Sequence, residues 1–195
     1  MMDIVIKDLN KTYGEKTVLN NVSAVFHAGQ CTCIMAESGK GKTTLLRLIM
    51  GLEQPDSGSI SGVPERISVV FQEDRLCEDF SIAANIRMVL DNDTDISDDG
   101  IRELLSELSM QEDINTPVGQ LSGGMKRRVA IARAIAYDSE WLILDEPFKG
   151  LDETTRDKVI GTIVQKRKSV ILVSHNIEEA EKMHAVIIDP SSLFV

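Results

Sequence analysis

The chain contains 195 residues, of which 43% are hydrophobic and 27% are charged, and its formal net charge is −10. This length and composition predict one soluble globular domain, with or without an added lobe, that can bury a sizeable core. The acidic balance argues against a general nucleic-acid-binding protein, so no nucleic-acid partner is expected. No apolar run approaches the roughly 18 residues of a membrane span, and the N-terminal residues show no basic segment followed by a signal core. We therefore expect a cytoplasmic protein whose role at any membrane requires a partner.

The first part of the chain predicts β-strands. Residues 3–7 and 22–26 are rich in β-forming side chains, and residues 31–35 form a further apolar run. Between the first two runs, Tyr13 is a lone aromatic beside the turn residue Gly14. Taken alone, this pattern predicts a loop tyrosine whose hydroxyl contacts water.

The three cysteines, an odd number, favour reduced thiols. Cys31 and Cys33 stand two residues apart on a predicted strand and therefore share one face. A metal site would need more ligands than these two and the nearby His27. Packing in the core or against the sheet is therefore the expected role of both cysteines.

A glycine-rich loop follows the strand at 31–35 and leads into a helix that is expected to end before Gly51. The loop residues are Ala36, Glu37, Ser38, Gly39, Lys40, Gly41, Lys42, Thr43 and Thr44. Strand, glycine loop and helix in this order are the context of a phosphate-binding loop, in which backbone N–H groups and the helix dipole face an anion. The simpler alternative, a glycine-rich turn with a surface lysine, does not account for the flanking strand and helix.

Two positions of this loop are expected to contact the phosphates and their metal. Lys42 is placed to reach the β- and γ-phosphates, and the Thr43 hydroxyl to hold Mg²⁺. Ala36 stands where glycine is expected; alanine disfavours positive φ, so either the backbone there is ordinary or nucleotide affinity is reduced. Lys40 adds a positive charge inside the loop, which can offset such a loss.

The middle of the chain combines short strands with a long helical stretch. Turn residues between 55 and 62 frame a short strand, and the apolar run 67–71 ends at Gln72. Residues 81–137 carry a helical pattern, in which Ile101, Leu104, Leu105 and Leu108 form one apolar stripe. The acidic residues from 91 to 107 are expected to be a solvated face. A further helix is expected to begin near Ser122, whose hydroxyl can cap it.

Two all-apolar runs, residues 141–144 and 170–173, predict central parallel strands that are covered on both faces. Helices over 153–166 and 177–182 and a strand over 185–189 complete an α/β alternation.

Polar residues follow these strands at their carboxyl ends, which meet at one edge of a parallel sheet. Asp145 and Glu146 follow one central strand and His175 follows the other, so with Gln72 and the glycine loop they can converge on one nucleotide. Each alone has a simpler interpretation: a solvated glutamine, a turn at Asp-Glu-Pro, or a structural histidine. Their joint order makes coincidence the weaker explanation.

The segment Leu121-Ser122-Gly123-Gly124-Met125-Lys126-Arg127-Arg128 resembles the signature motif of ATP-binding cassette (ABC) ATPases. With the phosphate loop, Gln72, the run 142–147, the run 150–152 and His175, the resemblance covers nearly the whole chain. Residues 71–76 and 145–148 look most like those of importer ATPase subunits for nitrate, sulfonates or taurine. The marks of GTPases, Asn/Thr-Lys-x-Asp and a suitably placed Asp-x-x-Gly, are absent from the sequence.

The resemblance implies an α/β P-loop NTPase fold: a RecA-like core with an N-terminal antiparallel β subdomain and an inserted α-helical subdomain. The whole chain, residues 1–195, would form a single ABC ATPase domain. Its core would comprise residues 1–74 and 137–195, and its helical subdomain about 75–136.

The resemblance also implies ATP and Mg²⁺ as ligands, with a role for each matching residue. Tyr13 would stack on adenine, while Thr43, Gln72 and Asp145 would organise Mg²⁺. Glu146 would polarise the attacking water, and His175 would contact the γ-phosphate.

In this family two cassettes pack head to tail, so further site residues are implied to act across an interface. Ser122, Gly123 and Gly124 of one chain would meet the nucleotide held by the other, and Asp152 would cross between them. Lys149 stands near this expected interface, where a small residue is usual.

The implied partners are a membrane permease subunit, a second ABC ATPase subunit that is identical or a paralogue, and a substrate-binding protein. The chain would lie at the cytoplasmic face of the cell membrane as a peripheral importer subunit, with a docking groove along residues 73–90 that includes Leu76, Cys77 and Phe80. One alternative is a soluble ABC ATPase of nucleic-acid repair or translation, although such proteins usually carry a long coiled coil or two cassettes. A regulatory nucleotide sensor is a third possibility, against which the intact Glu146 and His175 argue.

Overall fold

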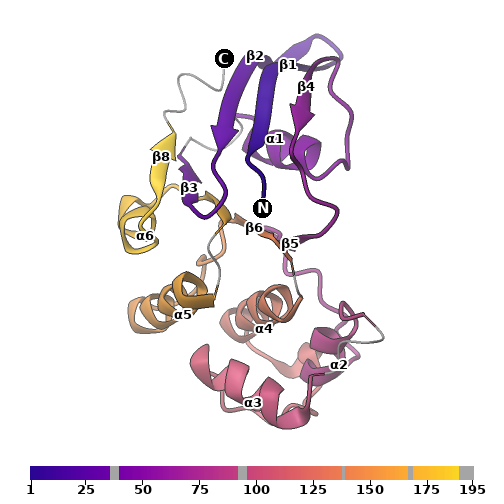
Figure 1. Cartoon of the computed structure of the whole chain (residues 1–195). Helices are drawn as coiled ribbons and strands as arrows, with labels where there is room; N and C mark the ends of the chain where they lie inside the picture. The colour runs from indigo at the N-terminus through magenta and orange to yellow at the C-terminus, as the bar shows by residue number, and fades with distance from the viewer. Residues whose placement is uncertain (36–39, 92–95, 138, 167–168, 189–195) are drawn as a thin grey trace.

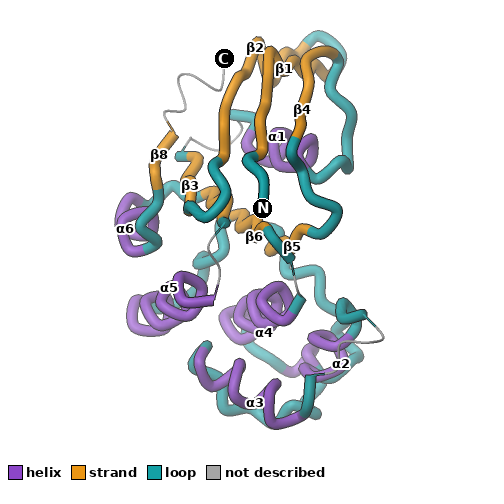
Figure 2. Tube along the Cα trace, in the orientation of Figure 1, coloured by secondary structure: helices purple, strands orange, loops and turns teal. Residues whose placement is uncertain are grey.

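The computed structural model describes residues 1–35, 40–91, 96–137, 139–166 and 169–188. These residues form a three-stranded sheet, a five-stranded sheet and a group of helices. Figure 1 shows the three-stranded sheet at the top with helix α1 (Lys42–Ile49) beneath it, and the five-stranded sheet across the middle. Most helices lie on the far side of the five-stranded sheet from α1 (Figure 2).

The three-stranded sheet is antiparallel and contains β1 (Ile4–Tyr13), β2 (Lys16–Phe26) and β4 (Ser57–Ser61) in the order β2-β1-β4. The predicted strands 3–7 and 22–26 are therefore too short, and the loop assignment for Tyr13 is wrong, because this residue ends β1 and pairs with Lys16. Apolar clusters mark only part of these strands: along the rest, single buried residues such as Leu9 and Leu19 stand among exposed polar ones. Residues with positive φ, Asp8 and Asn21, mark irregularities in the pairing that further obscure the alternation.

The five-stranded sheet is parallel and has the order β5-β6-β7-β3-β8. Its strands are β3 (Cys31–Ile34), β5 (Ile67–Val70), β6 (Trp141–Asp145), β7 (Val170–Val173) and β8 (Val186–Ile188). Each lies within one residue of a strand predicted from the sequence, and the predicted α/β fold class is confirmed.

The parallel sheet separates two hydrophobic cores, because successive side chains of a strand point to opposite faces. In β6, Trp141 and Ile143 pack with β1, β2 and α1, whereas Leu142 and Leu144 pack with the helices on the other side. Cys33 likewise belongs to the helical side, which confirms its expected place in the core. All five residues of β6 are buried, as a central strand covered on both faces requires.

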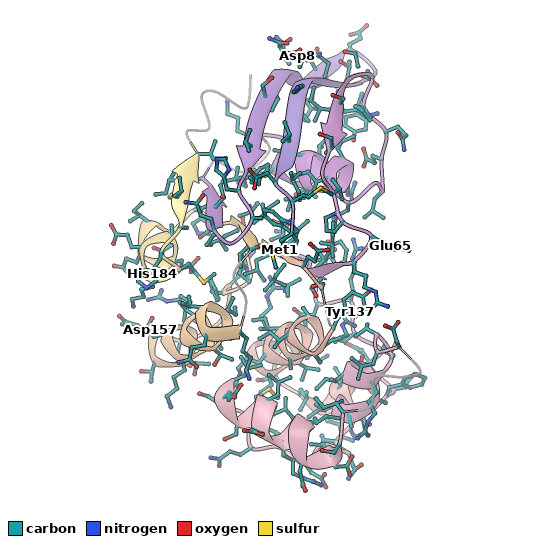
Figure 3. The ribbon with its side chains drawn as sticks, in the orientation of Figure 1. Met1, Asp8, Glu65, Tyr137, Asp157 and His184 are labelled. Atoms are coloured by element: carbon teal, nitrogen blue, oxygen red, sulfur yellow. The ribbon has the colours of Figure 1, made fainter. Side chains whose placement is uncertain are left out.

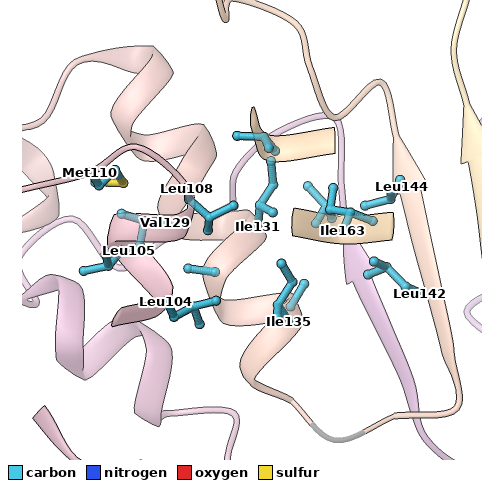
Figure 4. Packing of buried hydrophobic residues seen from close by; sticks show 14 of the residues in the cluster. Leu104, Leu105, Leu108, Met110, Val129, Ile131, Ile135, Leu142, Leu144 and Ile163 are labelled. Atoms are coloured by element: carbon cyan, nitrogen blue, oxygen red, sulfur yellow. The ribbon is translucent and has the colours of Figure 1, made fainter. Parts of the chain in front are cut away.

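The helices on the far side are α2 (Ile82–Arg87), α3 (Asp98–Glu107), α4 (Gly123–Ala136), α5 (Glu153–Lys166) and α6 (Ile177–Lys182). The predicted apolar stripe of α3 is buried, and its residues Leu104, Leu105 and Leu108 pack toward Val129 and Ile135 of α4 (Figure 4). The helical pattern over 81–137 is confirmed by α2, α3 and α4, which are separated by loops and the 3₁₀ turn Val118–Gln120, and the helix expected near Ser122 is α4.

Capping serines account for the helix starts in this region. Ser81, Ser97 and Ser122 are the N-cap residues of α2, α3 and α4, respectively. The hydroxyl of each serine accepts a hydrogen bond from the backbone N–H three residues later. Among the described residues, no helix is long and apolar enough to cross a membrane.

Candidate nucleotide site

A pocket of about 410 Å³ lies between the β1–β2 hairpin and the carboxyl edge of the parallel sheet. It is lined by Tyr13, Lys16, Val18, Gly41, Lys42, Thr43, Thr44, Gln72, Asp145 and Glu146. Most of the residues that the sequence placed at one nucleotide therefore lie around one cavity. Lys16 and Val18 were missed because β2 was expected to begin at residue 22.

The start of α1 forms the floor of this pocket. Gly41 is the N-cap residue of α1 with φ 94°, and as a glycine it has no side chain that could cap the helix. A methyl group on Gly41 would lie 2.8 Å from Cγ1 of Val18, so glycine is required both for the backbone angle and for the close approach of β2. The first N–H groups of α1 and the nearly buried Lys42, 7% exposed, suit an anion such as phosphate.

Four of the predicted loop residues, Ala36, Glu37, Ser38 and Gly39, fall outside the described residues. Lys40 is described and exposed, but it does not line the pocket.

The Asp145 carboxylate is 6% exposed, and its Oδ2 accepts a hydrogen bond from the Thr43 hydroxyl at 3.4 Å. Burial raises the pKa of this carboxyl, and Glu146 raises it further, whereas Lys42 and Thr43 act in the opposite direction. A bound cation would stabilise the ionised carboxylate that burial disfavours. Gln72 lines the same pocket.

These oxygen-bearing side chains fit Mg²⁺. The described residues hold no group of three or more His, Cys, Asp or Glu side chains that could bind a metal by themselves. Mg²⁺ does not need such a group, because it is usually bound through one or two protein ligands, substrate phosphates and water.

Glu146 follows β6 with φ 47°, an uncommon angle for a residue with a side chain. Its backbone N–H donates to the carbonyl of Val173 at 2.9 Å, which ties the turn to the end of β7. His175 does not line the pocket, but its Nδ1 lies 3.8 Å from Oε1 of Glu146. With 73% of its side chain exposed, His175 lies at the rim of the pocket, beside the Glu146 carboxylate.

Hydrogen bonds before and along α6 hold the loop that carries His175. The Ser174 hydroxyl donates to Glu179 at 2.5 Å and accepts the N–H of Asn176 at 3.0 Å. Asp157 of α5, labelled in Figure 3, pairs with Lys182 of α6 at 2.6 Å and so fixes the two helices together.

Tyr13 lines the pocket at the tip of β1, and its side chain is held by charged neighbours. Its hydroxyl donates to Glu53, which in turn pairs with Arg47 of α1 at 3.2 Å. The ammonium of Lys11 lies 5.3 Å from the centre of the Tyr13 ring. Burial raises the pKa of Tyr13, and the hydrogen bond to Glu53 raises it further, so the hydroxyl remains a donor. No sequence signal pointed to Glu53.

The remaining predicted site residues lie together at a different place. None of Ser122, Gly123, Gly124 and Asp152 lines the nucleotide pocket. A methyl group on Gly124 would lie 3.3 Å from the carbonyl oxygen of Gly150, so the start of α4 adjoins the loop that leads to α5. Asp152 caps α5 by accepting the N–H of Thr155 at 3.0 Å, a bond that lowers the pKa of its carboxyl.

A parallel sheet, a helix start with an N-cap glycine and a buried lysine, and a threonine hydroxyl beside a strand-end carboxylate define a P-loop NTPase. The family profile of the ABC transporters matches residues 19–149. The aliphatic sulfonates import ATP-binding protein SsuB 3 of Rhodococcus jostii is 37% identical over 184 residues, which cover 92% of this chain and 68% of that protein. The Nod factor export ATP-binding protein I of Burkholderia orbicola is 34% identical over 198 residues, which cover 92% of this chain and 65% of that protein.

Among solved structures, the dimeric structure of a bacterial ABC transporter cassette matches with a TM-score of 0.83 and 27% identity, covering 96% of this chain and 94% of that one. The chain therefore belongs to the ABC transporter family, as one of its ATP-hydrolysing transporter subunits. The comparisons support the transporter interpretation and give no support to a role in nucleic-acid repair or translation.

Proposed function

We propose that this chain binds ATP with Mg²⁺ in the pocket above α1 and hydrolyses it to energise import through a separate membrane subunit. One observation carries the proposal: the start of α1, Lys42, Thr43, Asp145 and Glu146 surround a single pocket at the carboxyl edge of the sheet. That edge is where open α/β sheets bind nucleotides.

Binding follows the chemistry of the lining. Adenine would stack on Tyr13, whose ring Glu53 and Lys11 hold in place. The phosphates would lie over the first turn of α1, where residues 41–44 would contribute backbone N–H groups and Lys42 would contribute charge. Thr43, Gln72 and Asp145 would hold Mg²⁺, which when bound offsets the negative charge of the phosphates.

In hydrolysis a water oxygen forms a bond to the γ-phosphorus, and the bond from that phosphorus to the β–γ bridging oxygen breaks to release ADP. The Glu146 carboxylate would orient this water and accept its proton. His175, 3.8 Å from the same carboxylate, would contact the γ-phosphate from the rim.

A second cassette would complete the site. The start of α4, with Ser122, Gly123 and Gly124, does not line the pocket of its own chain. Facing a partner's γ-phosphate, Ser122 and the N–H groups behind it would form an anion-binding helix end. Asp152 would lie at this interface next to the exposed Lys149. The partner is a second copy of this chain or a paralogue.

The relatives named as import proteins support import, and the relative named for export makes export the alternative direction. Aliphatic sulfonates are the substrate class that the import relatives suggest, with a permease and a substrate-binding protein as further subunits at the cytoplasmic face of the membrane. In this arrangement residues 1–74 and 137–195 form the core, and residues 75–136 form a helical subdomain.

The permease would dock beside the edge strand β5. An apolar pocket of about 440 Å³ there is lined in part by Phe71, Val89, Arg133 and Tyr137; Figure 3 labels Tyr137 at the end of α4. Of the residues expected to form a docking groove, Cys77 and Phe80 are exposed, while Leu76 is partly buried against the core. None of the three lines this pocket, so the groove would extend from it along 73–90.

The Glu146→Gln substitution tests the proposed chemistry. The amide keeps the shape of the side chain but cannot accept the proton, so phosphate release should fall about 100-fold or more while ATP binding persists. With ATP and Mg²⁺ this variant should shift from monomer to dimer on size exclusion, and adding Ser122→Arg should block the shift without preventing ATP binding. Wild-type turnover by Glu146→Gln would refute the assignment, and rapid turnover by an isolated monomer would refute the two-chain site.

A further inference from the structure

The Arg127 guanidinium, on the first turns of α4, is buried beneath the turn that carries Glu146. Its side chain is 4% exposed. Nη2 donates to the carbonyl oxygens of Asp145 at 3.0 Å and Glu146 at 2.7 Å, and Nε donates to that of Pro147 at 2.8 Å. One side chain thus binds three consecutive carbonyls at the end of β6.

The remaining nitrogen of Arg127 reaches the end of β5. Nη1 donates to the carbonyl oxygens of Phe71 at 2.5 Å and Gln72 at 3.4 Å, and it pairs with the Asp74 carboxylate at 3.0 Å. The same guanidinium therefore joins the strand end that carries Gln72 to the strand end that carries Glu146.

These contacts are what a buried arginine needs. A guanidinium that leaves water must keep its donors bonded, and its planar fork can serve several acceptors at fixed angles, which a lysine ammonium cannot. Arg127 does not line the nucleotide pocket, so its function is exerted through the backbone it holds.

We propose that Arg127 is a positioning residue that fixes the peptide groups of Gln72 and Glu146 relative to the start of α4. Because Ser122 begins the same helix five residues earlier, a shift of α4 would be transmitted to both strand ends through this guanidinium. The inference rests on the proposed roles of Gln72 and Glu146. It adds that their alignment depends on a side chain outside the pocket.

The test uses Arg127→Lys, which keeps the charge but not the fork, and Arg127→Met, which keeps the length but not the donors. The matched control is Lys166→Met. Lys166 of α5 pairs with Glu107 of α3 at 2.9 Å, so it also joins the core to the helices beyond, but it touches neither strand end. Each protein is measured for kcat and KM in phosphate release, for binding of a fluorescent ATP analogue, and for thermal unfolding.

Both Arg127 variants should lose about 10- to 100-fold in kcat, the effect of a small misplacement of catalytic groups. Their affinity for the ATP analogue should stay within about twofold of wild type, because the pocket-lining side chains are intact. Lys166→Met should keep the wild-type kcat even where its unfolding temperature falls, so a kcat loss confined to Arg127 is not general destabilisation.

A wild-type kcat in folded Arg127→Lys would overturn the proposal, and so would an equal loss of ATP affinity and turnover. If Arg127→Met fails to fold, Arg127→Lys alone decides. The outcome is separable from that of the proposed chemistry: if Glu146→Gln is inactive and Arg127→Lys is fully active, only the positioning role fails.

Discussion

Replacing Gly41 with alanine perturbs the position where β2 comes closest to the start of α1. The new methyl would lie 2.8 Å from Cγ1 of Val18 and 3.2 Å from the Val18 carbonyl oxygen, in a residue with φ 94°. Left-handed backbone costs a residue with a side chain about 1–2 kcal/mol, and overpacking costs about 1–3 kcal/mol. Gly41→Ala should therefore lower the free energy of unfolding by about 2–5 kcal/mol.

Two assays separate the causes. Urea unfolding gives the free energy, and titration with a fluorescent ATP analogue reports whether the helix start has shifted in the pocket. Val18→Ala removes Cγ1 but leaves the backbone angle and the carbonyl contact, so the double variant should recover about 0.5–3 kcal/mol relative to the sum of the single changes. An unchanged unfolding midpoint and slope for Gly41→Ala would refute the argument for glycine at this position.

Three further predictions follow from burial and charge. Burial raises the pKa of Cys31 and Cys33 to about 12, so a thiol reagent at pH 8 should label only the exposed Cys77 in the native protein and all three cysteines after unfolding; native labelling of more than one would contradict the burial. The raised pKa of Asp145 means that its contribution to stability is present below the ordinary value of 3.8 and is lost as pH rises through the native pKa. Asp145→Asn, which does not ionise, should therefore unfold without ligand at a higher urea concentration than wild type at pH 7, and the difference between the two midpoints should disappear at low pH. A difference that grows at low pH would contradict the raised pKa of Asp145. Arg75→Glu places an anion where the Arg75 guanidinium stacks 3.7 Å from the centre of the Phe71 ring. Co-sedimentation of this variant with membranes of the native cell should fall, while phosphate release by the isolated protein persists. Undiminished co-sedimentation would count against docking along 73–90.

The sequence predicted the parallel sheet well because its strands are short and wholly apolar. Runs such as 141–144 and 170–173 leave no doubt about burial on both faces, and their bounds agree with the structure to within a residue. The antiparallel strands were underestimated because half of their residues face water and irregular pairing interrupts the period. The error had a consequence at the site: with β2 begun too late, Lys16 and Val18 had no place beside the pocket.

The candidate site was predictable where one motif supplies several residues, and unpredictable where contact depends on tertiary packing. The strand-loop-helix context pointed to Lys42 and Thr43 without any structure. Glu53, which meets Tyr13 across 40 residues of sequence, carries no local signal. Arg127 is likewise one of several basic residues in a helix, and its burial depends on two strand ends that are distant in sequence.

The carboxylate pair at the end of β6 shows how a correct expectation can rest on geometry that sequence does not reveal. In a regular strand, consecutive side chains point to opposite faces, so Asp145 and Glu146 should not both face one cavity. They both line the pocket because Glu146 leaves the strand conformation, with φ 47°. A strained angle of this kind costs about 1–3 kcal/mol and persists only where surrounding contacts impose it. The three carbonyls bonded by Arg127 bracket this turn, and the N–H of Glu146 is bonded by β7. The strained turn that brings the second carboxylate into the pocket and the buried Arg127 that bonds its carbonyls are thus two parts of one arrangement.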